Sequence, residues 1–70
     1  MITLNGRPML KFTIRLEIEY KHGLKRMQTF EVNSFNRDAA EQTILRNHVS
    51  ADESDRAKTI RLVLVNFTHV

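Results

Sequence analysis

The chain has 70 residues and no cysteine, so we expect one small domain without disulfide bridges or thiolate metal sites. Its 11 Lys and Arg residues outnumber eight Asp and Glu residues, which gives a formal net charge of +3 and a sequence pI of about 9.8, a balance that suits nucleic acid or an acidic protein surface. No stretch approaches the roughly 20 consecutive apolar residues that a membrane-spanning helix needs.

Residues 1–9 are expected to form a lead-in, either a flexible segment or an edge strand, that precedes a single domain of residues 10–70. Asn5-Gly6 is typical of a turn, and Pro8 disfavours a helix. The first residues lack the apolar core and the small-residue cleavage site of a signal peptide. We therefore expect a cytoplasmic protein, in the host cytoplasm if the chain is phage-encoded.

Residues 10–21 alternate between apolar and polar side chains. Because successive side chains of a strand point to opposite faces, this alternation predicts a strand with one buried and one wet face. The apolar set is Leu10, Phe12, Ile14, Leu16, Ile18 and Tyr20.

A turn at His22-Gly23 is expected to lead into a second strand over residues 24–33, which gives a hairpin. Phe30 and Val32 share one face of this strand. Met27, Thr29 and Glu31 share the other face.

The period changes after Asn33, which predicts a helix of about three turns. Ser34 or Asn36 is expected to cap it, and Asp38 suits the positive end of the helix dipole. One face of the helix is expected to carry Ala40, Ile44, Leu45 and His48, whereas Ala39, Gln42 and Arg46 point away.

Residues 50–58 are polar and predict a loop, and residues 59–70 predict the third strand. Ile60, Leu62 and Leu64 fall on one face of that strand, and Val63, Val65 and Phe67 on the other. The element order β-β-α-β then favours an α+β fold, in which an antiparallel three-stranded sheet of order 2-1-3 carries one helix on one face.

This arrangement leaves the second face of the sheet open. We expect a partner-binding surface there, because an apolar ridge beside charged side chains is typical of contact surfaces. Its predicted members are Lys11, Arg15, Arg61, Val63, Val65 and Phe67. Two alternatives stay open: Ile2 and Leu4 of the lead-in cover the ridge, or two copies pair through the third strand as an edge.

Catalytic, metal-binding and cofactor-binding patterns are missing from the sequence, so we expect neither an enzyme nor a cofactor. His22, His48 and His69 match no metal-ligand spacing, and their ordinary interpretation is a turn residue, a helix-end residue and a terminal residue. Two glycines cannot supply a phosphate-binding loop of the usual composition.

Weakly specific nucleic-acid binding is the alternative function, through Lys11, Arg15, Lys25, Arg26 and Arg61. Sheets that bind RNA usually display several aromatic residues together, whereas this face has only Phe67. Three glutamates on the same face would repel phosphates, so a protein partner is the first prediction.

The stretch FEVNSFNRDAAEQTI resembles small phage-encoded inhibitors of host machinery, of the type of the bacteriophage T7 inhibitor of host RNA polymerase, and some anti-CRISPR proteins. The matching residues are Phe30, Glu31, Val32, Asp38 and Ala40, within a layout that covers residues 10–70. The resemblance implies a β-β-α-β fold and a non-catalytic protein that binds and inhibits one host protein. The basic pI departs from the inhibitors that mimic DNA.

Overall fold

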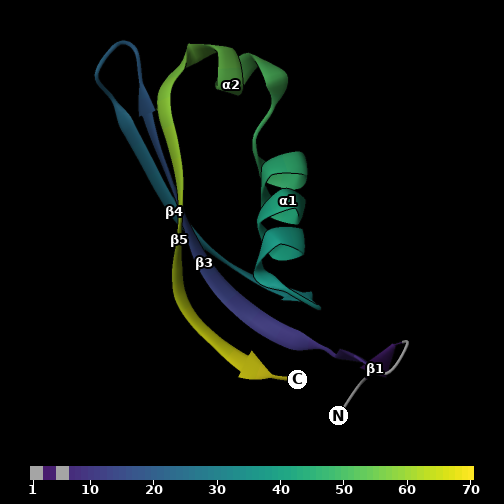
Figure 1. Ribbon diagram of the computed structural model, residues 1–70. Helices are drawn as coiled ribbons and strands as arrows, with labels where there is room; N and C mark the ends of the chain where they lie inside the picture. Colours follow the sequence, from purple (N-terminus) through teal and green to yellow (C-terminus); the bar gives the residue numbers. More distant parts are fainter. Residues whose placement is uncertain (1–2, 5–6) are drawn as a thin grey trace.

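The computed structural model describes residues 3–4 and 7–70. A short hairpin comes first, formed by β1 (Thr3–Leu4) and β2 (Arg7–Pro8). The remaining elements, in chain order, are β3 (Leu10–Tyr20), β4 (Lys25–Ser34), α1 (Arg37–His48), α2 (Ala51–Arg56) and β5 (Ala57–His69) (Figure 1).

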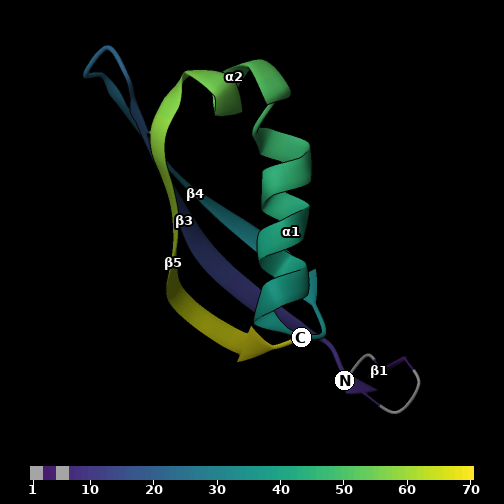
Figure 2. The ribbon, with the colours of Figure 1, turned by 45° about the horizontal axis from the view of Figure 1, so that its top comes forward.

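The main sheet has three antiparallel strands in the order β4-β3-β5. This confirms the predicted α+β architecture and the sheet order 2-1-3. Both helices lie on one side of the sheet, as the two views in Figures 1 and 2 show. The central strand is β3, whose strict alternation gives one face for the core and one for solvent.

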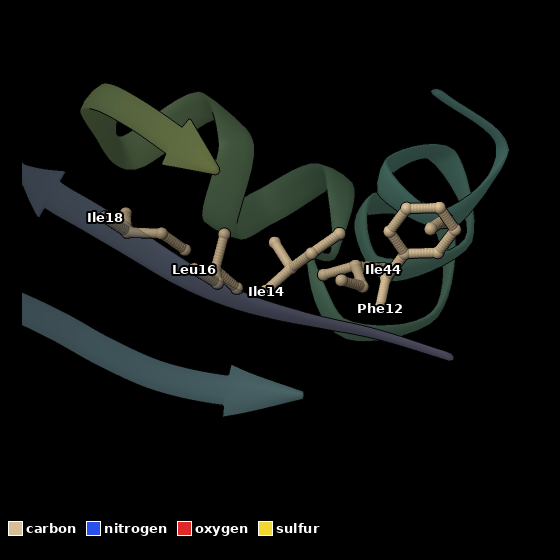
Figure 3. Packing of buried hydrophobic residues seen from close by; sticks show 6 residues of the cluster. Phe12, Ile14, Leu16, Ile18 and Ile44 are labelled. Carbon is tan, nitrogen blue, oxygen red and sulfur yellow. The ribbon is translucent and has the colours of Figure 1, made fainter. Parts of the chain in front are cut away.

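The core lies between β3 and α1. Phe12, Ile14, Leu16 and Ile18 on β3 are each at most 4% exposed, and Ile44 of α1 is fully buried against them (Figure 3). Ala40 is also fully buried, because its small side chain lets the helix approach the sheet closely. A core of this size is what a 70-residue chain can bury.

The turn between β3 and β4 has the predicted glycine conformation. Gly23 has a φ of 97°, a region that side chains with a Cβ rarely adopt. Its N–H donates to the Tyr20 carbonyl over 3.0 Å, which closes the turn.

Helix α1 begins and ends as its sequence indicates. Asn36 is the N-cap, and its Oδ1 accepts a hydrogen bond of 2.8 Å from the Ala39 N–H. Ser34, the other cap considered, is instead buried at the end of β4. Asp38 lies in the first turn and His48 in the last, where the His48 ring stacks on Phe30 with centroids 4.0 Å apart.

The prediction of a loop over residues 50–58 is wrong. Residues Ala51–Arg56 form α2, and β5 already begins at Ala57. Ser50 caps α2, because its Oγ accepts a hydrogen bond of 3.0 Å from the Glu53 N–H. The Ser-x-x-Glu spacing of a capping box was therefore present in a segment whose polarity suggested a loop.

The predicted faces of β5 are correct up to Leu64 and wrong beyond it. Ile14 pairs with Leu64 and Thr13 pairs with Asn66, so Val65 is an extra residue, a β-bulge. The bulge shifts the alternation by one. Phe67 therefore pairs with Phe12 on the helix side of the sheet, with ring centroids 6.1 Å apart.

The N-terminal hairpin lies beyond the first residues of β3 and does not cross the sheet (Figures 1 and 2). Its strands pair with each other in a separate sheet. Ile2, one of the two side chains considered as a cover for the open face, lies outside the described residues. Neither α1 nor α2 combines the length and the apolar character needed to cross a bilayer.

Candidate functional site

The open face of the sheet carries the side chains of β3, β4 and β5 that point away from the helices. Register assigns them, because residues directly opposite each other in a sheet share a face. The charged members are Lys11, Arg15, Glu17, Glu19, Lys25, Glu31 and Arg61. Four cations thus stand against three carboxylates, which makes the face mixed in sign.

Arg15, Glu17 and Arg61 form a cluster at the centre of this face. The Arg15 Nε lies 2.7 Å from a Glu17 carboxylate oxygen, and the Arg61 Nε lies 3.8 Å from the other one. Val63 pairs with Arg15, and Met27 pairs with Glu17, so two apolar side chains flank the charges. Met27 is 62% exposed and available for contact. We call these five residues the Glu17 patch.

Lys11, a further predicted member of the site, lies apart from the Glu17 patch. It pairs with Asn33 and Thr68 near the other end of β3. Its Nζ lies 3.5 Å from a Glu31 oxygen, in an exposed ion pair. Exposed pairs of this kind contribute at most about 1 kcal/mol, so Lys11 is free to exchange this carboxylate for another.

The predicted apolar ridge of Val63, Val65 and Phe67 is not continuous. Val63 is half-buried on the open face, Val65 is 55% exposed in the bulge, and Phe67 lies on the helix side. The bulge is the physical reason, because one extra residue reverses the face of every side chain after it.

Arg26 also lies on the helix side, because it pairs with Ile18 of the core. Its Nη1 donates to the Glu53 carboxylate over 2.7 Å and to the His48 carbonyl over 3.3 Å. The Tyr20 hydroxyl donates to the same Glu53 oxygen. Arg26 therefore holds α2 on the sheet and does not belong to a cationic surface with Lys11 and Arg15. Lys25 pairs with Glu19 and remains on the open face.

This cluster of Tyr20, Arg26 and Glu53 shifts the pKa of each member. Hydrogen bonds from Tyr20 and then from Arg26 lower the pKa of Glu53. The bond to Glu53 raises the pKa of Tyr20 above its usual 10.0, and it raises the pKa of Arg26 as well. All three shifts favour the bonded states, so the cluster is a structural tie at neutral pH.

A groove between the helices and β5 is a feature that the sequence analysis missed. Its volume is about 500 Å³. The apolar lining comes from Leu45, Val49, Ala51, Ile60 and Leu62, and Glu41, Ser50 and Ser54 complete it. Helix α2 forms one wall of the groove. Because a loop was predicted in place of this helix, the sequence analysis did not predict the groove. The Ser50 cap was the signal that would have revealed this wall.

Among residues 3–4 and 7–70, no three His, Asp or Glu side chains gather as a metal site would require. His48 stacks on Phe30, and His22 stacks on Tyr20 with centroids 5.4 Å apart. Asp52 of α2 forms an exposed ion pair of 3.0 Å with Arg56, one turn later in the same helix. No family model, curated protein or solved structure matches the chain.

Proposed function

We propose that this chain is a small non-catalytic protein that binds another protein through the open face of its sheet. The observation that carries the proposal is the Glu17 patch, in which two arginines meet one carboxylate between Val63 and Met27. An arginine head group offers several donors, and its stem covers apolar surface, which is why arginine is enriched in protein interfaces.

The charges of the patch favour an acidic protein surface as partner. Two guanidinium groups share Glu17, so the group carries a net charge of +1 and retains free donors. A carboxylate of a partner would bind these donors without displacing Glu17. Complementary charges of this type set the rate and the specificity of association.

Nucleic acid is the alternative partner, and the net charge of +3 favours it. Two features of the described residues speak against it. Glu17 and Glu31 stand among the cations of the open face, and Arg26 is on the other side of the sheet. Phosphates would meet one carboxylate at the centre of the face and another beside Lys11.

The resemblance to phage-encoded inhibitors supplies the class of partner in this proposal, a component of host machinery in the host cytoplasm. Such a protein acts by occupying a surface of its target and needs no reactive group. An adaptor that joins two proteins uses the same type of surface.

The experiment is affinity capture from bacterial lysate with three forms of the chain. The first is the natural sequence, the second carries Arg15→Glu and Arg61→Glu, and the third carries Arg46→Glu on the exposed side of α1. We expect one protein to be retained by the first and third forms and to be at least tenfold depleted with the second. Equal retention by all three forms would remove the Glu17 patch from the proposal.

A nuclease added to half of the samples separates the two partner classes. Retention that is unchanged by nuclease supports a protein partner. Retention that disappears, together with an affinity that falls steeply with salt, assigns the face to nucleic acid, because binding to phosphates releases counterions.

A further inference from the structure

Strand β5 is an edge strand, and among the described residues no strand pairs with its outer side. On its inner side it pairs with β3, and register shifts at Thr13/Ile14 and at Glu19/Tyr20 of β3 bound the regular ladder. The regular stretch of β5 is therefore residues 59–64. Alternate residues of this stretch direct their N–H and C=O groups away from β3. A further strand of this length can pair there without meeting a bulge.

The helix side of this edge is apolar and incompletely covered. Ile60, Leu62 and Leu64 lie on that side and are only partly buried. Helix α1 packs against β4 and β3, and the groove of about 500 Å³ has Ile60 and Leu62 in its lining. Apolar side chains of an added strand would remove this surface from water. The helix side thus favours apolar residues at alternate positions of the added strand.

On the open side, Arg61 supplies the charge of the edge. Its side chain is 70% exposed, and its Nε lies 3.8 Å from a Glu17 oxygen, which is too far for a hydrogen bond. The other Glu17 oxygen accepts from the Arg15 Nε over 2.7 Å. The Arg61 guanidinium group therefore retains donors for a second carboxylate. A carboxylate opposite Arg61 on an added strand would form an opposite-charge cross-strand pair, which stabilises a sheet.

We propose that the protein partner adds an extended acidic segment to the edge of β5, as an antiparallel strand opposite residues 59–64. The segment has apolar side chains opposite Ile60, Leu62 and Leu64, and an Asp or Glu opposite Arg61. In this mode of recognition, main-chain hydrogen bonds provide affinity and alternate side chains provide specificity. The inference rests on the proposed function and deepens it, because it names the part of the partner that meets the Glu17 patch at Arg61.

Charge selects an acidic segment over a second copy of this chain. Strand β5 contains no Asp or Glu, so no pairing of β5 with another β5 places a carboxylate opposite Arg61. Each copy also carries a net charge of +3, so two copies repel each other, whereas an acidic segment is attracted.

The probe is a designed peptide, acetyl-Leu-Thr-Val-Glu-Val-Thr-amide. With its first residue opposite Leu64, its glutamate is opposite Arg61 and its apolar residues are on the helix side. Nuclear magnetic resonance follows the backbone amide signals of the natural chain as the peptide is added to about 5 mM. We expect the signals of residues 59–64 to shift, with a dissociation constant of about 1 mM or lower, a modest affinity because the short peptide is ordered on binding. Unchanged signals in this stretch, or shifts confined to β4, would overturn the proposal.

Methylation of peptide nitrogens tests whether the peptide pairs as a strand. One form carries N-methyl groups on its first, third and fifth residues, and the other on its second, fourth and sixth. Only one of these sets of N–H groups points toward β5 in an antiparallel ladder. We expect one form to lose binding and the other to retain it. Binding by both forms, or by neither, would contradict strand pairing.

An exchange of charges tests the contact with Arg61. A peptide with lysine in place of glutamate should bind the natural chain about tenfold more weakly, because like charges directly opposite each other destabilise a sheet. Arg61→Glu should reverse this preference. Arg46→Glu makes the same change at an exposed residue of α1 and should leave the preference unaltered. Equal binding of both peptides by the natural chain, a result that needs no variant to fold, would overturn the acidic character of the segment.

Two comparisons separate the inference from its alternatives. Signals of β5 that shift with protein concentration alone would assign the edge to a second copy and overturn the proposal. If the peptide fails to bind while capture from lysate still depends on Arg15 and Arg61, the inference is wrong and the proposed function stands. If the peptide pairs with β5 while capture does not depend on these arginines, the edge site stands and the proposed function is wrong.

Discussion

At the scale of single residues, Glu53 is the side chain on which the position of α2 depends. It is 15% exposed and accepts from Arg26 of β4 and Tyr20 of β3. A helix of six residues is too short to be stable by itself, so its attachment must come from tertiary contacts. The groove wall is therefore held by this carboxylate and by the Lys21 N–H, which donates to the Arg56 carbonyl at the end of α2 over 3.0 Å.

We predict that Glu53→Gln lowers the free energy of unfolding by about 1 kcal/mol near neutral pH, because a neutral amide replaces a charged acceptor. The low pKa of Glu53 sets the pH dependence. Its stabilisation is complete above the ordinary glutamate pKa of 4.5 and is lost as the pH falls through the lower folded-state value. Urea unfolding between pH 7 and pH 2 should show this acid loss in the natural chain and a smaller loss in the variant.

Asp52→Asn is the matched control, since it makes the same chemical change one residue earlier in α2. The Asp52 side chain is 79% exposed, and its ion pair with Arg56 is accessible to water. We expect a change below about 0.5 kcal/mol. If both variants lose stability equally, Glu53 is not the tie between α2 and the sheet.

At the scale of elements, the bulge of β5 decides which face Phe67 joins. Residues 59–64 follow the alternation that the sequence predicts, and the residues after Val65 do not. The Phe67 ring thereby lies beside that of Phe12 on the helix side, and the open face is left without an aromatic residue. A period-two pattern identifies the strand but does not show where an extra residue interrupts it.

Deletion of Val65 should be tolerated, because the deletion restores a regular ladder while Phe67 keeps its place opposite Phe12. We expect the free energy of unfolding to change by about 1 kcal/mol or less, measured by chemical unfolding. Nuclear Overhauser contacts between the two rings should persist.

Deletion of Val63 is the comparison for this prediction. It removes a residue from the regular part of β5 and turns either Ile60 and Leu62 or Leu64 to the wrong face. Each exposed side chain costs about 1.5–3 kcal/mol, which should leave little stability. Equal tolerance of both deletions would contradict the assigned bulge.

At the scale of the whole molecule, β3 to β5 form the packed unit and the N-terminal hairpin is an appendage. The core consists of residues from Phe12 to Ile44, and β1 and β2 pair only with each other in the described sheets. The last link between the ends of the unit is the Val70 N–H, which donates to the Met9 carbonyl over 3.2 Å.

We predict that a chain beginning at Met9 keeps the fold, with a free energy of unfolding within about 0.5 kcal/mol of the full chain. Thermal unfolding followed by circular dichroism is the measurement. A chain beginning at Ile14 should fail to fold, since it lacks Phe12 and the first part of β3. A loss above about 2 kcal/mol in the longer form would mean that the hairpin belongs to the core.

The sequence by itself determined the elements that strong local patterns specify. Alternation identified β3 as the central strand, the glycine turn and the second alternation identified β4, and a polar cap with helical spacing identified α1. Each of these patterns reflects burial of one face, and burial is encoded in the spacing of apolar residues. Arg15, Arg61 and Val63 were also placed together correctly, because all three lie where the register is regular.

Only the tertiary structure decided three matters, each for a physical reason. Helix α2 is polar, and it exists because Ser50 caps it and Glu53 binds side chains from two strands. Phe67 does not belong to the predicted ridge, because the bulge before it depends on pairing with β3, and no local sequence pattern predicts that pairing. Arg26 does not belong to the predicted cationic surface, because it pairs with Glu53, which is distant in sequence but adjacent in space. Long-range contacts choose among local alternatives, and the groove beside β5 is the result of that choice.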